Sequence, residues 1–406
     1  MKIIHTSDWH LGHVLYGYSR EDEHKAMIEQ MVKMVKAHQP DAFVLSGDVY
    51  DNSQPSASVQ KMLQDALLDL HHACPEMQII CIAGNHDSGT RHEVFSGPWR
   101  ELNVSMLGTI ARESDLEQYI IDVPGKGWIV AVPYAAQRFM PDHVYHQLAE
   151  LVDKRNHQAL PVILMAHLAV EKSDWRGHEL SDDKNIGGLD CQPIDEFGTG
   201  YDYVALGHIH KHQTLDEEGR VCYCGTPIPL SFDEVYSGNA HGVMLVECTG
   251  HGQPVSQEML QIEPLWPLVN LPLCHTDVQK NDPDAGFADW ETVKEQLETF
   301  DQDQHVYIRL NVLVDNYLDV GANGEAEKIA QGKSYRFCRP INAKRRTLTA
   351  QQQSTTDSRQ YTTSEFSQLD AIEVAEMYFQ RKEMTFTDEM KELFNMAKNS
   401  AGNPNS

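Results

Sequence analysis

The most informative stretch of the chain is Gln78-Ile-Ile-Cys-Ile-Ala-Gly-Asn-His-Asp87. Its first half is a short apolar run rich in isoleucine, which is typical of a buried β-strand over Gln78–Ala83. Gly84 then permits a tight turn and close backbone approach. Because Asn85, His86 and Asp87 follow the strand directly, where packing has no need of them, the stretch predicts a strand whose end carries functional side chains.

Four other polar clusters follow predicted strands in the same way. The strands are expected at Lys2–Thr6, Ala42–Ser46, Val162–Ala166 and Tyr203–Leu206, and the clusters after them are Asp8-Trp9-His10, Gly47-Asp48-Val49-Tyr50-Asp51, His167, and Gly207-His208-Ile209-His210. In layered α/β folds, loops at the carboxyl ends of strands assemble a common site. The five clusters are therefore expected to converge.

Together the clusters offer two carboxylates, one amide oxygen and four imidazoles as metal ligands: Asp8, Asp48, Asn85, His10, His167, His208 and His210. This set is too large for one ion and suits two. A bridging carboxylate, for which Asp48 is the candidate, lets two cations lie ~3.5–4 Å apart, as in phosphoryl displacement. Mixed oxygen and imidazole donors without thiolate favour Mn²⁺, with Mg²⁺ and Fe²⁺ as alternatives.

The chain of 406 residues is long enough for several domains. Alternating apolar runs and amphipathic segments, including helices expected at 20–39 and 56–72, predict an α/β domain over 1–265. Prolines at 264, 267 and 272 predict a boundary. Beyond it we expect a small α/β capping domain over 273–346, a flexible linker over 347–363, two partner-docking helices over 364–398 and a disordered tail over 399–406. Alternating apolar residues over 306–314 predict a half-buried strand in the capping domain.

The formal net charge of −27 argues against a chain that binds nucleic acid through its overall charge. One stretch, Gly332–Ala350, has six basic residues and no acidic one. Lys344, Arg345 and Arg346 within it are candidate DNA contacts through counterion release. The alternative is an ordinary solvated surface.

The ordered motifs Asp-x-His, Gly-Asp-x-x-Asp, Gly-Asn-His-Asp, His and Gly-His-x-His resemble those of the calcineurin-like metallophosphoesterase superfamily. Three further segments, Ser7–Gly12, Cys224–Glu234 and Ile372–Phe379, are similar to the nuclease subunits of break-repair complexes in that superfamily. The likeness covers nearly the whole chain. It is strongest over residues 1–235 and weakest over 270–365.

This resemblance implies a sandwich of two β-sheets flanked by helices, with two Mn²⁺ at one edge. By motif position, the first metal would be held by Asp8, His10, Asp48 and His210, and the second by Asp48, Asn85, His167 and His208. His86 would lie over the scissile phosphate as a catalytic group outside the ligand set. Asp51 would orient His86.

The resemblance further implies a DNA exonuclease and endonuclease whose 364–398 segment docks on an ATPase of the ABC and SMC type. It also implies a homodimer formed through the helix at 56–72. A phosphatase or nucleotide phosphodiesterase with the same metals, and a non-catalytic scaffold, remain alternatives. Because the N-terminus lacks an apolar signal segment and no run reaches ~18 apolar residues, a cytoplasmic protein outside the membrane is expected.

Overall fold

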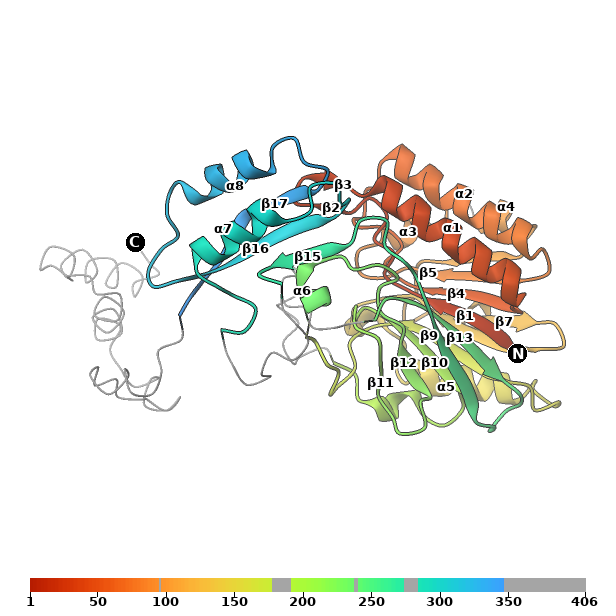
Figure 1. The fold of residues 1–406 in the computed structure, drawn as a ribbon. Helices are drawn as coiled ribbons and strands as arrows, with labels where there is room; N and C mark the ends of the chain where they lie inside the picture. Colours follow the sequence, from red (N-terminus) through yellow and green to blue (C-terminus); the bar gives the residue numbers. More distant parts are fainter. Residues whose placement is uncertain (95, 177–190, 237–239, 274–283, 347–406) are drawn as a thin grey trace, which may run out of the picture. The chain divides into compact units, whose positions relative to one another are not determined.

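The protein is described by a computed structural model over residues 1–94, 96–176, 191–236, 240–273 and 284–346 (Figure 1). The linker expected at 347–363, the docking helices at 364–398 and the tail at 399–406 lie outside the described residues. No helix among the described residues is long and apolar enough to cross a membrane.

Two six-stranded sheets form the larger part of the structure. The first has the order β14-β13-β1-β4-β5-β6, with strands Val255–Gln261, Gly242–Cys248, Lys2–Thr6, Ala42–Ser46, Gln78–Ile82 and Val104–Leu107. The second has the order β11-β12-β10-β9-β8-β7, with strands Gln213–Thr214, Val221–Tyr223, Tyr203–Gly207, Val162–His167, Gly127–Val132 and Ile120–Val123.

Helices cover the outer faces of these sheets (Figure 1). The first sheet packs against α1 (Glu21–His38) and α2 (Ala57–Ala73), and the second against α5 (Val144–Asp153). Shorter helices lie in the connections, at Gly89–His92, Ser96–Arg100, Leu116–Tyr119, Gln137–Phe139, Ile194–Phe197 and Phe232–Tyr236. The expected two-sheet sandwich flanked by helices is confirmed.

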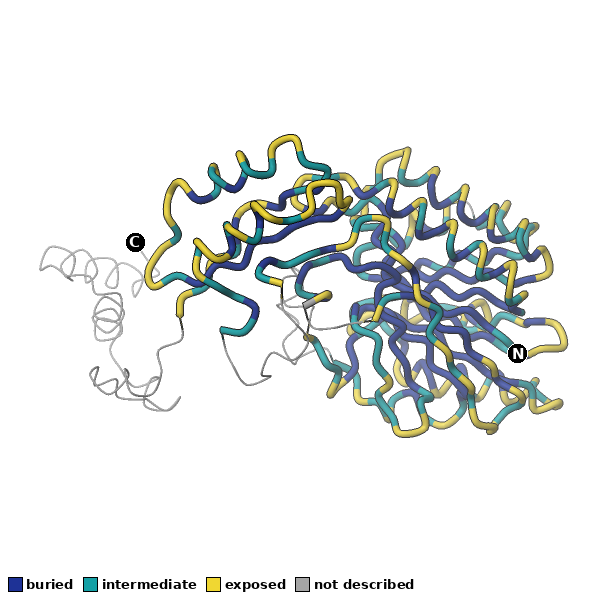
Figure 2. Tube along the Cα trace, viewed as in Figure 1, coloured by how far each residue is buried: buried dark blue, intermediate teal, exposed yellow. Residues whose placement is uncertain are grey.

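The core follows from the two-residue period of the strands. In β4, Phe43 and Leu45 face α1 and α2, whereas Val44 faces the second sheet. Ile79 and Ile80 of β5 divide in the same way. Both faces of the central strands are therefore buried, as the dark strands of Figure 2 show, and this explains why their sequences are continuously apolar.

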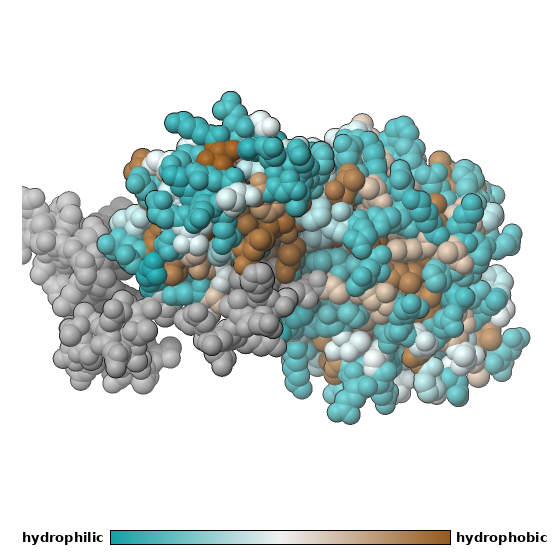
Figure 3. Space-filling view, in the orientation of Figure 1, coloured by the Kyte–Doolittle hydropathy of each residue, from teal (hydrophilic) through white to brown (hydrophobic). Residues whose placement is uncertain are grey.

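The covering helices are amphipathic. In α1, Met27 and Met31 are buried against the first sheet, whereas Asp22, Lys25 and Glu29 are exposed. This division follows the 3.6-residue period of a helix. The face of the molecule drawn in Figure 3 is accordingly mainly hydrophilic over these helices, with smaller apolar patches between charged side chains.

The carboxyl ends of the central strands meet at one edge of the sandwich. Strands β1, β4 and β5 run parallel in one sheet, and β9 and β10 run parallel in the other. The two sheets are joined near this edge, where the Ser46 hydroxyl donates to the Ala205 carbonyl over 2.9 Å. The loops that carry the five polar clusters consequently leave the sandwich together.

A small parallel sheet follows, in the order β15-β16-β17, with strands Leu268–Leu271, Tyr307–Val314 and Arg336–Arg345. Helices α7 (Trp290–Thr299) and α8 (Ala322–Ala330) pack on it. This sheet starts before the expected domain boundary at residue 273, because β15 pairs with β16. The prolines flank this strand and do not interrupt it.

The expectation that β16 is half-buried is wrong, because both faces of the strand are buried. Arg309 and Asn311, on its polar face, are only 3% and 1% exposed. Arg309 Nη2 lies 2.9 Å from Asp233 Oδ1, and its guanidinium lies over the Phe232 ring at 5.0 Å. Both partners belong to α6 (Phe232–Tyr236), so this face of the small sheet packs against the larger part of the chain.

Candidate metal centre

The loops of the centre are held in an unusual backbone conformation. Asp8, His10 and Asp48 have positive φ angles of 54°, 44° and 48°, which non-glycine residues adopt at a cost. Backbone hydrogen bonds fix them, from the Asp8 amide to the Gly47 carbonyl at 3.0 Å and from the His10 amide to the Asp48 carbonyl at 3.1 Å. The loops after β1 and β4 therefore hold each other in place.

Two glycines bring the ligands close together. A Cβ on Gly47, whose φ is 89°, would lie 2.2 Å from Nδ1 of His167. A Cβ on Gly84 would lie 2.2 Å from Oδ1 of Asp48. Any larger residue at either position would displace a candidate ligand.

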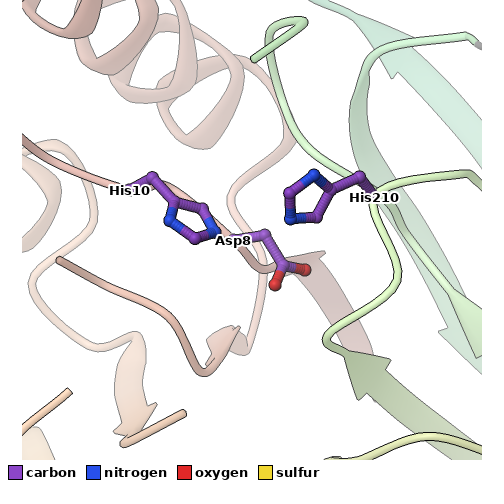
Figure 4. Close-up of side chains that lie close together, drawn as sticks. All are labelled: Asp8, His10 and His210. Carbon is purple, nitrogen blue, oxygen red and sulfur yellow. The ribbon is translucent and has the colours of Figure 1, made fainter. Parts of the chain in front are cut away.

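The structure brings the predicted ligands together in two groups. Asp8, His10 and His210 form one, and Asp48, His167 and His208 form the other; within each, the ligand atoms lie within 4.8 Å of one another. Figure 4 shows the first group, with Asp8 and His10 on one loop and His210 entering from another. Asn85 adds an oxygen to the second group, since its Oδ1 lies 2.9 Å from His167 Nε2 and 3.0 Å from His208 Nδ1.

Asp48 lies between the groups. Its Oδ2 is 3.3 Å from Nε2 of His167 in the second group and 3.7 Å from Nε2 of His10 in the first. Its Oδ1 accepts a hydrogen bond from the His86 amide at 2.9 Å. A carboxylate oxygen that faces both groups has the placement a bridging ligand needs.

The donor chemistry fits two divalent cations. The Nδ1–H of His167 donates to the Ser46 carbonyl at 2.8 Å, and the Nδ1–H of His210 donates to Glu234 Oε1 at 3.1 Å, so in both rings Nε2 is the atom left to bind a metal. Such bonds orient metal-binding imidazoles. His10 Nε2 is buried, has no hydrogen-bond partner among the described residues and faces Asp48, as a ligand atom would.

The charges of the centre are strongly coupled. Burial raises the pKa of the Asp8 carboxyl to about 6. Burial would also raise the pKa of Asp48, but the facing His167 and His10 hold it well below its usual range. Burial disfavours the protonated His167, yet the neighbouring Asp48 raises its pKa to about 9. Protons thus occupy a site whose carboxylates would otherwise repel each other, and cations must compete with them.

His86 lies beside this centre, half-buried, with its ring centroid 4.8 Å from that of His10. Its Nδ1–H donates to the backbone carbonyl of Asp51 at 2.9 Å. The Asp51 carboxylate lies at His10, with Oδ1 3.5 Å from Nδ1. Asp51 therefore meets His86 through its main chain and the candidate ligand His10 through its side chain, a division that the motif did not predict.

Two acidic residues support the centre in ways that the sequence interpretation missed. The Asp87 carboxylate accepts from the amides of Val49 at 3.1 Å, Tyr50 at 3.0 Å and Gly84 at 2.9 Å, and so ties the loops after β4 and β5 together. Its position at the end of Gly-Asn-His-Asp was the available signal.

The second is Glu234, which is buried beneath His210. Besides accepting from His210, its carboxylate accepts from the Thr226 hydroxyl at 3.1 Å and the Leu230 amide at 3.0 Å. These bonds fix the carboxylate and, through it, the His210 ring. The segment Cys224–Glu234, which ends on this residue, was the available signal, but it does not indicate a histidine 24 positions earlier in the chain as the partner.

Replacing Glu234 by glutamine is expected to weaken metal binding about tenfold, because partners of this kind contribute ~10–100-fold to affinity. The side chain keeps its size but loses the charge that holds the Nδ1–H tautomer of His210. Isothermal titration with Mn²⁺ measures the effect. Glu258→Gln, at an exposed position of β14, is the matched control. Equal affinity in the two variants would contradict the role of Glu234.

Comparison with known proteins agrees with this geometry. Residues 1–212 match the family model described as calcineurin-like phosphoesterase. The match covers more than half of the 406 residues, and the chain belongs to this family.

Within the family, the chain belongs with the SbcD proteins, the D subunits of the nuclease SbcCD. It is 36% identical over 283 residues to the SbcD protein of Rhodobacter capsulatus, covering 63% of this chain and 68% of that protein. It is 29% identical over 341 residues to SbcD of Escherichia coli K12, covering 78% of this chain and 79% of that protein. It is 28% identical over 280 residues to SbcD of Bacillus subtilis, covering 64% of this chain and 69% of that protein. The resemblance found in the motifs is confirmed.

Proposed function

We propose that the chain is the metal-dependent DNA nuclease component of an SbcCD-like complex, acting as an exonuclease on duplex ends and an endonuclease on hairpins and single strands. The observation that carries the proposal is Asp48, whose Oδ2 faces both ligand groups beside His86. Similarity to proteins named as parts of the nuclease SbcCD supports a nucleic acid as the phosphodiester substrate.

In this proposal the candidate ligands bind the metals and His86 donates a proton. Two divalent cations at such a centre supply an activated water and neutralise charge on the phosphoryl oxygens. Asp8, His10, Asp48 and His210 would hold one, and Asp48, Asn85, His167 and His208 the other. His86 donates Nδ1–H to the Asp51 carbonyl, which leaves Nε2 to deliver a proton to the leaving oxygen. Mn²⁺ suits the mixed donors best, with Mg²⁺ and Fe²⁺ as alternatives.

The partners follow from the same family. Residues 364–398 would dock on an SbcC-like ATPase, and α2 (Ala57–Ala73) would pair two copies into the homodimer of a heterotetramer. The complex would act in the cytoplasm, at the nucleoid. An ATPase partner would also explain how an acidic chain could act on DNA, since the partner could supply basic surface.

A cleavage assay tests the function. The full chain with Mn²⁺ is given hairpin DNA or a small phosphate ester, with and without the ATPase partner. We expect cleavage of the hairpin, stimulated by the partner with ATP. Hydrolysis of the ester alone would favour a phosphatase or nucleotide phosphodiesterase, and no hydrolysis of either would favour a scaffold.

The basic stretch is a further part of this proposal. Arg346 Nε lies 3.0 Å from Asp315 Oδ1, and Lys344 Nζ lies 3.9 Å from Asp284 Oδ1. The Arg345 guanidinium lies over the exposed Tyr317 ring at 5.4 Å. Two of the three charges thus already face carboxylates, which limits the number of phosphates that the stretch can neutralise.

Replacing Lys344, Arg345 and Arg346 together by alanine is expected to weaken DNA binding. The plot of log K against log salt concentration should also become less steep, by about one to three in slope, because each lost phosphate contact removes ~0.9. Fluorescence anisotropy at several salt concentrations measures the slope. Lys25→Ala, on the exposed face of α1, is the control. A slope equal to that of the unmodified protein would exclude the stretch as a DNA contact.

A further inference from the structure

A cavity of about 410 Å³ adjoins the metal centre. Two candidate ligands of the second group, His167 and His208, form part of its wall. The rest comes chiefly from the segment that follows β8, including Tyr134, Gln137 and Met140, and from Gln192. The cavity therefore opens beside the position of the scissile phosphate.

The described lining combines charged, polar and apolar side chains. It holds no lysine or arginine, but it includes two carboxylates, Asp142 and Glu196, and three imidazoles, His143, His167 and His208. Tyr134, Met140 and Leu168 offer apolar and aromatic surface, and the side-chain amides of Gln137 and Gln192 offer both donors and acceptors. A flat, neutral ring with polar edges satisfies both parts of this lining.

Tyr134 is placed to contact such a ring. Its amide donates to the Ala83 carbonyl at 2.9 Å, which anchors the residue to the loop after β5 that also carries Asn85. Its side chain is 39% exposed, and its ring stands edge-on to His167, with centroids 6.3 Å apart. A base stacked on Tyr134 could therefore belong to the nucleotide whose phosphate lies at the metal centre or to its direct neighbour.

We propose that this cavity receives the base of the nucleotide next to the scissile phosphate, unstacked from its neighbours, with Tyr134 as its stacking surface. The inference rests on the proposed function and names the part of the substrate that its site recognises. The amides of Gln137 and Gln192 would contact the edge of the base. A nucleotide that is already unpaired, as in a hairpin loop or a frayed end, enters at least cost.

Abasic substrates test the proposal directly. The full chain with its ATPase partner and Mn²⁺ is given oligonucleotides of one sequence that carry either a natural base or an abasic residue on each side of the cleaved bond in turn. We expect kcat/KM of the unmodified protein to fall roughly tenfold for the abasic residue on one side, in line with the contribution of one stacked base. Tyr134→Ala is expected to lose about tenfold on the natural substrate and nothing further on the abasic one.

Control variants separate recognition from structure. Tyr134→Phe keeps the ring and is expected to retain the discrimination between natural and abasic substrates. Phe139→Ala removes a 52% exposed aromatic side chain outside the cavity and is expected to cut the natural substrate normally. Mn²⁺ affinity of Tyr134→Ala is expected to be unchanged.

Equal cleavage of natural and abasic DNA by the unmodified protein would overturn the proposal. An equal loss on both substrates in Tyr134→Ala would overturn it too, because that loss would be structural. An unmodified protein that cuts no DNA would instead contradict the proposed function, and the cavity proposal with it.

Discussion

Replacing His86 by alanine is expected to lower DNA cleavage by ~10²–10⁴-fold, the usual contribution of general acid catalysis, and to leave metal binding intact. His86 lies outside both ligand groups, and its Nδ1–H is directed to the Asp51 carbonyl. Its contact with Asp48 is made by the backbone amide, which alanine retains. The variant therefore removes the proton donor and keeps the frame of the centre.

The leaving group makes this prediction specific. A phosphodiester that releases p-nitrophenolate needs no proton, so the loss on that ester is expected to be far smaller than the loss on DNA. Turnover of both substrates and Mn²⁺ stoichiometry are measured on the same preparation. His72→Ala, at an exposed position near the end of α2, is the control. Equal losses on the two substrates would contradict the role of His86 as an acid.

Replacing Asp48 by asparagine is expected to reduce the metal content from two ions per chain to one or fewer and to abolish cleavage. Asparagine keeps the shape of the side chain and tolerates the φ of 48°, so the loop is expected to persist. What disappears is the negative charge of the oxygen that faces both His10 and His167. Two cations at close range have no neutralising bridge without it.

Metal analysis after gel filtration, by inductively coupled plasma mass spectrometry, measures the outcome. Asp122→Asn removes an exposed carboxylate from β7 and is expected to keep full metal content. A stoichiometry of two ions in the Asp48 variant would show that another residue bridges the metals.

The central strands and the convergence of the candidate ligands could be predicted because both depend on local sequence. Strands buried on two faces must be apolar throughout, as β4 and β9 are, and their boundaries agree with the expected ones to within one residue. The clusters that follow them can only leave at the strand ends. Knowledge of the strand order was not needed to expect that Asp8, Asp48 and His208 would meet.

The features that were missed depend on contacts between distant segments. The polar face of β16 looks solvent-exposed in sequence, yet Arg309 is buried because Asp233 and Asn270 satisfy its guanidinium. Glu234 likewise joins the site only once the chain has folded it beneath His210. The cavity beside Tyr134 is formed by segments on either side of β9, so no single stretch indicates it.

Helix α6 joins two parts of the molecule within three consecutive residues. The small sheet holds its first two, since Arg309 pairs with Asp233 and Asn270 donates to the Phe232 carbonyl at 3.3 Å. The third, Glu234, holds the candidate ligand His210. A helix this short cannot absorb a displacement along its length. A shift of the small sheet that moves α6 would therefore also move the carboxylate that orients His210, so the position of this sheet and the orientation of one candidate ligand are linked through a single helical turn.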